Sequence, residues 1–263
     1  MAWLRVASSA ALLRLGLRLW PGRRAVRRSV RQSARSAVTA STWSGWDRDL
    51  RRAVVVFGAA LAGMNLCFYL AIERLPLGTA VAIEFSGPIV VAALWARSRR
   101  NLVAVGLAAV GVLLLADVQW EASAAGVVAA LGAAALWAVY ILAGGRVAGR
   151  VDGLEGLSWA LLIGTLVIGP FGVAGLAAGD PSLPVVAVVA GCVLVGLLSN
   201  VVPYSLDQAV LPRLAPGQFA LLLSLLPVTA TVLGALLLGQ RPGGAELVGI
   251  GLVVAALLAR ARS

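Results

Sequence analysis

The chain has 263 residues, of which 60% are hydrophobic and 13% are charged, whereas an average soluble domain is about 45–50% apolar and about 25% charged. So few polar residues cannot cover a globule in water, which excludes the soluble classes and predicts a membrane protein. All 22 basic residues are arginines, the net charge is +11, and the arginines lie between apolar runs, which favours membrane orientation over nucleic-acid binding.

Several kinds of enzyme chemistry are disfavoured by the sequence. The sequence has no histidine, and Cys67 and Cys192 lie inside apolar runs, so no histidine metal site, CxxC motif or disulfide framework is indicated. Dinucleotide-binding, P-loop and hydrolase motifs are also absent from the sequence. The triplet Asp47-Arg48-Asp49 has the form of a metal-nucleotide motif, but a solvated charge cluster beside the membrane is the better interpretation. We therefore expect no enzyme, no metal and no cofactor.

The apolar runs predict the spanning segments. A spanning helix needs about 20 mostly apolar residues, and two of the runs reach that length only by including flanking residues. In chain order the expected spans are 53–72, 75–96, 102–116, 122–145, 156–179, 181–206, 214–240 and 242–259.

The first 52 residues are less clear. Residues 1–20 are a weak first span, because Arg5, Arg14 and Arg18 interrupt them and an arginine at mid-span costs about 2.5–3.5 kcal/mol. Arg14 within the apolar core also argues against a cleaved signal peptide. Residues 21–52 are rich in arginine and serine without apolar periodicity, and we expect an Arg-rich cytoplasmic loop there.

The loop arginines predict the orientation. Alternate loops carry almost all of them, at 21–52, 97–100, 146–150, 213 and 260–262, whereas the other loops carry only Arg74 and Arg241. The positive-inside rule places the first set in the cytoplasm. The C-terminus is then cytoplasmic.

The sequence also matches itself at an offset of 139 residues, which pairs Arg74-Leu75 with Arg213-Leu214, Gly78 with Gly217 and Pro88 with Pro227. After a four-residue loop difference, 105–106 and 114–116 match 248–249 and 257–259. Because an odd number of spans separates the copies, they point in opposite directions, and inverted repeats with helix breakers are typical of transporters. A chance match between apolar helices is the alternative.

Glu84 is the most informative residue, because it lies near the middle of the 75–96 span. A carboxylate at that depth is costly to bury alone, so it predicts a proton carrier or a partner for a substrate ammonium group. Ser86 and Pro88 follow it, and Pro88 removes a helical hydrogen bond, so we expect helix breaks at Pro88 and Pro227. The alternative is a structural glutamate bonded to a neighbouring helix.

Further polar or aromatic residues lie at membrane depth. Asn65 and Tyr69 are four residues apart, as are Asn200 and Tyr204, so each pair shares one helical face. If they converge with Glu84, they would line a cavity for a small zwitterion, although such residues also serve to hold helices together. The expected cavity residues are Asn65, Tyr69, Ser86, Trp137, Tyr140, Asn200 and Tyr204.

These stretches resemble the EamA branch of the drug/metabolite transporter superfamily, and within it the bacterial exporters of threonine and homoserine. The likeness covers roughly residues 53–260 and is more specific than hydropathy alone. It is carried by Gly63-Met64-Asn65, Phe68-Tyr69-Leu70, Leu75-Pro76-Leu77-Gly78 and the run from Ala80 to Pro88, then by 137–142 and 203–206.

The resemblance implies an all-α polytopic membrane protein, an inverted-repeat bundle of about nine helices where the family has ten. Residues 4–20 look like the family's second helix, so we expect the family's first helix to be missing. The first EamA repeat then comprises 1–20 and 53–118, and the second comprises 122–260. The resemblance also implies export driven by the proton gradient.

The sequence thus predicts an inner-membrane exporter of small amino-acid-like metabolites, working by proton antiport. Its expected partners are the lipid bilayer, a small substrate and the proton gradient, with no nucleic acid; a homodimer is left open. The alternatives are a non-transporting remnant or scaffold that lacks the first helix, and an exporter of another metabolite or drug.

Overall fold

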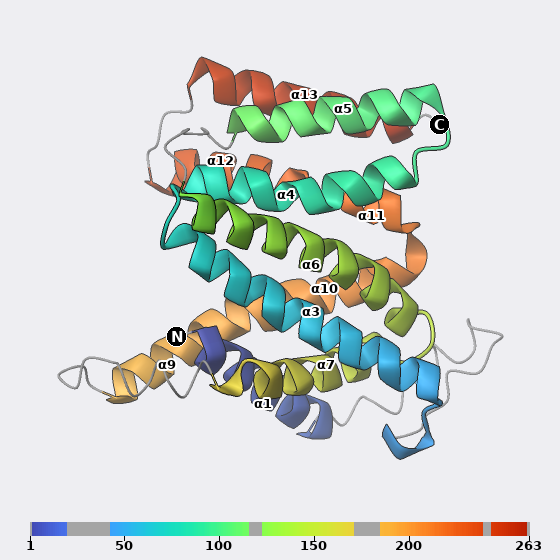
Figure 1. Ribbon diagram of the computed structural model, residues 1–263, viewed down its shortest axis with the longest axis vertical. Helices are drawn as coiled ribbons and strands as arrows, with labels where there is room; N and C mark the ends of the chain where they lie inside the picture. The colour runs from blue at the N-terminus through green and yellow to red at the C-terminus, as the bar shows by residue number, and fades with distance from the viewer. Residues whose placement is uncertain (1, 20–42, 116–122, 171–184, 239–242, 262–263) are drawn as a thin grey trace. The chain divides into compact units, whose positions relative to one another are not determined.

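The computed structural model describes residues 2–19, 43–115, 123–170, 185–238 and 243–261, and every element within them is a helix (Figure 1). This confirms the predicted all-α class. The elements are α1 (Ala2–Leu19), the 3-10 turn η1 (Trp43–Gly45), α3 (Arg48–Ile72), α4 (Leu77–Leu94), α5 (Arg99–Leu115), α6 (Ala124–Ala148), α7 (Gly153–Val167), α9 (Val185–Gly196), the π-helical η2 (Leu197–Val201), α10 (Val202–Val210), η3 (Leu211–Arg213), α11 (Pro216–Leu222), α12 (Leu225–Leu238) and α13 (Gly244–Ala261).

Within the residues that the structure describes, five helical segments are long and apolar enough to cross a membrane, and each lies on an expected span. They are Arg48–Ile72, Leu77–Leu94, Ala124–Ala148, Val188–Arg213 and Pro216–Leu233. Gly153–Val167 and Gly244–Ala259 are shorter apolar helices on two further expected spans. Most of the Arg-rich loop (20–42) and the second half of the expected span 156–179 (171–184) lie outside the described residues.

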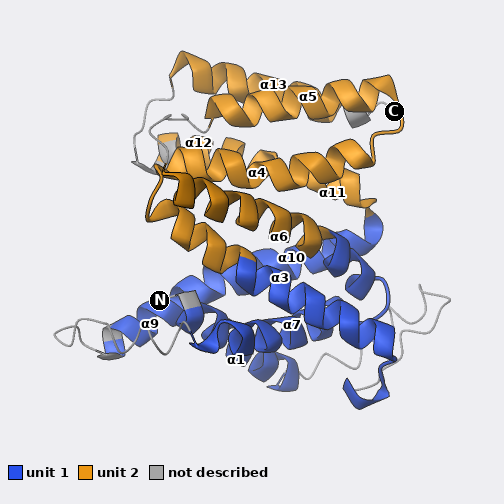
Figure 2. Ribbon diagram, viewed as in Figure 1, with its two compact units in different colours: residues 1–63, 142–213 blue, residues 64–141, 214–263 orange. Residues whose placement is uncertain are grey.

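The helices form two compact units, one of residues 1–63 and 142–213 and the other of residues 64–141 and 214–263 (Figure 2). In unit 1, α1 packs against α7 in the opposite direction: Trp3 near the start of α1 donates its indole N–H to Thr165 O near the end of α7, at 3.0 Å. Asp152 caps the N-terminus of α7, because its side chain accepts hydrogen bonds from the N–H groups of Leu154 and Glu155.

A second N-cap in unit 1 joins distant parts of the sequence. The Asp47 carboxylate accepts from Leu50 N–H at 2.7 Å at the start of α3 and forms an ion pair with Arg150, which follows α6. The Leu50 hydrogen bond, followed by the charge of Arg150, lowers the pKa of the Asp47 carboxyl below its ordinary value. The triplet 47–49 is therefore accounted for by a helix cap and two surface ion pairs, because Asp49 pairs with Arg52.

In unit 2 the helices that the internal repeat matches lie side by side. α5 packs against α13, and α4 packs against α11. α5 and α13 run in opposite directions (Figure 1), since Gly111 near the end of α5 meets Gly249 near the start of α13. Packing between oppositely directed copies is what an inverted repeat requires.

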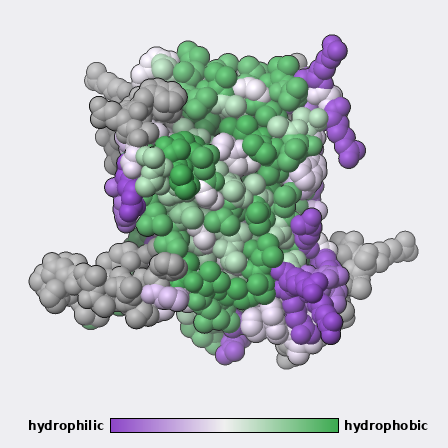
Figure 3. Space-filling view, in the orientation of Figure 1, coloured by the Kyte–Doolittle hydropathy of each residue, from purple (hydrophilic) through white to green (hydrophobic). Residues whose placement is uncertain are grey.

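The outward faces of α5 and α13 are apolar, as expected for helices in contact with lipid. Figure 3 shows them in green, with hydrophilic side chains gathered where α5 begins. The exposed apolar residues include Leu102, Val103, Val110 and Leu113 on α5, and Leu247, Val248, Val254 and Leu258 on α13. In a bilayer, acyl chains would cover these side chains.

Gly111 provides a test of the α5–α13 contact. A Cβ atom there would lie 2.8 Å from both the Gly249 carbonyl oxygen and Val253 Cγ2, whereas a Cβ at Gly106 on the same helix would meet nothing within 4 Å. We expect Gly111→Ala to destabilise the protein by about 1–3 kcal/mol through overpacking. Gly106→Ala is the matched control and should not lower the thermal unfolding midpoint in detergent, because alanine has the higher helix propensity and its Cβ meets no neighbour. Equal midpoints for the two variants would contradict this packing.

Candidate transport site

Glu84 lies in the middle of α4, within unit 2. It is buried, with 9% of its surface exposed, and its neighbours Phe85, Gly87 and Pro88 are buried as well. Among the described residues, no hydrogen bond or ion pair joins its carboxylate to another side chain. A lone buried carboxylate is costly, so this position favours a group that is neutralised by a proton or a ligand.

Pro88 adds a second polar atom at the same place. α4 continues without interruption from Leu77 to Leu94, so the break expected at Pro88 does not occur. Pro88 still lacks the N–H that would bond to the carbonyl four residues earlier, which is that of Glu84. Glu84 therefore combines a buried carboxylate with a backbone carbonyl that has no helical partner.

Contacts with α6 hold this part of α4 in place. Gly87 lies so close to α6 that a Cβ atom would overlap the carbonyl oxygen of Ala134. One turn further along α6, the ring of Trp137 packs edge-on against Phe85, with ring centroids 4.9 Å apart and an interplanar angle of 73°. Such an edge-to-face pair is a favoured aromatic geometry. Two contacts with α6, made by Phe85 and Gly87, thus hold the turn of α4 that follows Glu84.

The other expected cavity residues divide between the two units. Ser86, Trp137, Asn65 and Tyr69 are half-buried in unit 2, and Tyr140 is fully buried there. The Phe85–Trp137 contact places Trp137 beside the residue that follows Glu84. Asn200 and Tyr204 belong to unit 1. Assignment of all seven residues to one cavity stays a prediction.

Asn200 has a structural partner. It lies in the π-helical segment η2 and is 1% exposed, and its amide donates to Ser9 Oγ of α1 at 3.3 Å. The single hydroxyl proton of Ser9 lies within reach of two carbonyl oxygens, Arg5 O at 2.6 Å and Gly196 O at 3.0 Å. The Asn200–Ser9 bond therefore joins α1 to the α9–η2 segment. Hydrogen bonds of this kind hold helices together in lipid. This is the alternative that the sequence left open for such residues.

Sequence reasoning missed Gln208, four residues after Tyr204 on the same face of α10. Gln208 is 3% exposed, and neither atom of its side-chain amide has a hydrogen-bond partner in the part of the chain that the structure describes. It packs against the start of α7, where a Cβ on Gly153 would lie 2.9 Å from Gln208 Cβ. The spacing of Asn200, Tyr204 and Gln208 was the available signal.

The repeat is not symmetric at the site. The second copy is interrupted, with α11 ending at Leu222 and α12 beginning at Leu225, shortly before Pro227. Ser224 closes the turn by donating to Leu221 O at 2.6 Å. The residue matched with Glu84 at the 139-residue offset is Leu223, so only the first copy carries an acid. In the described ranges, no group of acidic or sulfur side chains could hold a metal ion.

Substitution of Gln208 and of Asn200 tests how much a hydrogen-bonded side-chain amide contributes to the stability of this fold. We expect Gln208→Met to raise the unfolding midpoint, because an unpaired buried amide costs about 1–3 kcal/mol. Asn200→Leu should lower it, by an amount near the average of about 0.6 kcal/mol for membrane interhelical hydrogen bonds. Thermal unfolding of both variants in detergent makes the comparison. A lower midpoint in Gln208→Met would show that its amide stabilises the protein.

Comparison with known proteins identifies the family. The model of the EamA-like transporter family matches residues 124–259. The threonine/homoserine exporter RhtA of Escherichia coli K12 is 37% identical over 212 residues, which cover 80% of this chain and 70% of RhtA, and RhtA of Salmonella typhimurium LT2 is 36% identical over the same shares. A protein of known crystal structure shares the fold, with a TM-score of 0.68 and 16% sequence identity. The alignment covers 98% of this chain and 85% of the chain in that structure. The chain belongs to the EamA-like transporter family, and it is a multi-pass inner-membrane exporter of the drug/metabolite transporter type.

Proposed function

We propose that this chain exports small amino-acid-like metabolites, of the threonine and homoserine kind, in exchange for protons. The observation that carries the proposal is the buried carboxylate of Glu84, which has no partner among the described residues and lies in the middle of a spanning helix. The substrate class is supported by the 37% identity to a protein named for threonine and homoserine export. Such substrates carry an ammonium group, which a carboxylate binds well.

Coupling follows from competition for one site. A carboxylate in a site of low polarity is stabilised either by a bound proton or by the ammonium group of a substrate. Because one carboxylate cannot hold both, protonation of Glu84 from outside releases the substrate, and loss of the proton to the cytoplasm restores the binding site. One cycle then moves a proton inward and a substrate outward.

The surroundings of Glu84 give further contacts for an amino acid. Its backbone carbonyl, freed by Pro88, is a second acceptor for an ammonium group. Asn65, Tyr69, Trp137 and Tyr140, in the same unit, are proposed to line the remainder of the cavity.

The loop arginines support a topology for this exporter. We place the C-terminus in the cytoplasm, because the arginine-rich loops would then all lie inside. Residues 53–118 and 122–260 are assigned to the first and second repeats, with 1–20 belonging to the first.

Glu84→Gln tests the role of the carboxylate. The substitution keeps the size of the side chain but removes its charge and its proton exchange, so export should fall at least tenfold and lose its response to an uncoupler. Cells loaded with threonine or homoserine, and a panel of other amino acids, provide the measurement. Full, uncoupler-sensitive export by Glu84→Gln would remove Glu84 from this role.

Glu73→Gln is the matched control, since Glu73 also belongs to unit 2 but is an exposed residue paired with Arg74. It should export at the wild-type rate. If wild-type protein in the membrane exports none of the amino acids, the proposed substrate class is wrong, whatever the variants do.

The orientation has its own test. A C-terminal fusion to green fluorescent protein should fluoresce, and a C-terminal fusion to alkaline phosphatase should be inactive, because the first folds in the cytoplasm and the second only outside it. The opposite pair of results would place the C-terminus outside and reverse the proposed topology.

A further inference from the structure

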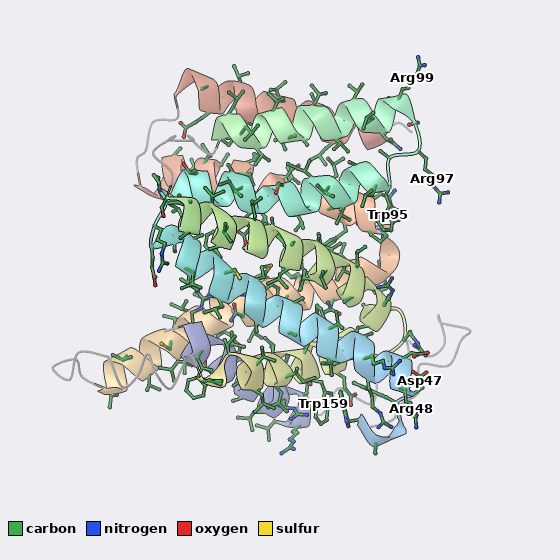
Figure 4. The ribbon with its side chains drawn as sticks, in the orientation of Figure 1. Asp47, Arg48, Trp95, Arg97, Arg99 and Trp159 are labelled. Atoms are coloured by element: carbon green, nitrogen blue, oxygen red, sulfur yellow. The ribbon has the colours of Figure 1, made fainter. Side chains whose placement is uncertain are left out.

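Two arginines stand one turn apart at the C-terminal end of α1, in unit 1. Arg14 is half-buried, and Arg18, in the last turn of α1, is exposed. The guanidinium carbon of Arg14 lies 4.0 Å from the ring centroid of Trp159, which is a favourable cation–π geometry. Trp159 belongs to α7 and is labelled in Figure 4. One face of the Arg14 guanidinium is therefore held by an aromatic ring.

Trp159 belongs to a cluster of three tryptophans. Trp43 lies 5.0 Å from Trp159 and 5.5 Å from Trp46, and Trp46 lies 6.4 Å from Trp159, all between ring centroids. Trp46 is 3% exposed, and Arg51 Nε donates to its carbonyl oxygen at 2.8 Å, which fixes the turn before α3. The ring beneath Arg14 is thus packed within an aromatic cluster.

Within the described ranges, the N–H groups at the edge of the Arg14 guanidinium form no hydrogen bond. Trp159 contacts its face, and Arg18 and Glu155 act on it through their charges, but no acceptor forms a hydrogen bond with its N–H groups. Neighbouring arginines are already engaged: Arg51 bonds the backbone, and Arg150 pairs with Asp47. Arg14 and Arg18 are therefore the pair that can receive an external anion.

The same end of α1 carries an exposed apolar strip. Leu15 and Leu19, next to the two arginines in sequence, are 54% and 69% exposed. In a membrane protein an exposed leucine at this position faces acyl chains. Cationic and apolar surfaces therefore meet at the end of one helix, and together they complement an anionic phospholipid, in which a negatively charged headgroup adjoins apolar chains.

We propose that the C-terminal end of α1 binds an anionic phospholipid, with Arg14 and Arg18 holding the headgroup phosphate and Leu15 and Leu19 against the acyl chains. A guanidinium presents paired N–H donors that match two phosphate oxygens. Stacking on Trp159 orients the Arg14 fork in advance and so reduces the entropy lost on binding. Basic sites beside spanning helices are a known form of anionic-lipid recognition.

The test measures lipid binding by the purified full-length protein in detergent. Phosphatidylglycerol and cardiolipin should raise the thermal unfolding midpoint, and phosphatidylcholine should not. In Arg14→Gln/Arg18→Gln the phosphatidylglycerol concentration needed for half the shift should rise about tenfold, as expected for the loss of charged hydrogen bonds. Native mass spectrometry should show the matching loss of bound phosphatidylglycerol.

Two further variants separate the lipid site from folding and from general charge. Arg18→Gln keeps the Arg14–Trp159 contact and should still weaken lipid binding. Arg97→Gln/Arg99→Gln removes the same charge from an exposed segment of unit 2 (Figure 4) and should bind like wild type. The proposal is overturned if both double variants weaken binding equally, if phosphatidylcholine stabilises as well as phosphatidylglycerol, or if inorganic phosphate reproduces the shift.

Discussion

The physical constraint on which this structure depends is the absence of water in the hydrocarbon core of a bilayer. Each backbone amide must bond within its own helix, and each polar side chain must find a partner or serve a purpose. Asn200 meets the requirement through Ser9, and that bond joins α1 to the α9–η2 segment. Glu84 and Gln208 do not meet it among the described residues, and they therefore stand out from the polar groups that only hold helices together.

The inverted repeat provides the scaffold, and its asymmetry provides the chemistry. α5 and α13 pack in opposite directions at Gly111 and Gly249, where the lack of side chains lets the backbones approach. At the prolines the copies differ: α4 runs through Pro88, whereas the matched helix is interrupted at Leu223 and Ser224 before Pro227. At the matched position the uninterrupted copy has Glu84 and the interrupted copy has Leu223. Contacts of Gly87 and Phe85 with α6 hold the backbone beside Glu84. A single fixed carboxylate is what the proposed exchange of one proton for one substrate requires.

The sequence was sufficient to locate the helices and to single out Glu84 as a buried acid, because both predictions depend on local properties. Apolar run length predicted the spans, and an acid within such a run is conspicuous without any knowledge of packing. Pro88 was harder to interpret, because whether a proline interrupts a helix depends on the neighbours that support it, here through Gly87 and Ala134. Gln208 was missed because its significance lies in the absence of a partner, which only the packing of α10 reveals.

The significance of Arg14 also depends on packing that the sequence does not reveal. Judged as an isolated residue in an apolar run, it costs about 2.5–3.5 kcal/mol at mid-span and makes residues 1–20 a weak membrane segment. In the structure it lies in the second half of α1, over the ring of Trp159, beside two further tryptophans that come from the turn before α3. Tryptophan and arginine both favour the interface between lipid and water, where the ring supports the charge and the guanidinium stays within reach of headgroups. The residue that weakens α1 as a free-standing span therefore also joins the second half of α1 to α7, through its contact with Trp159.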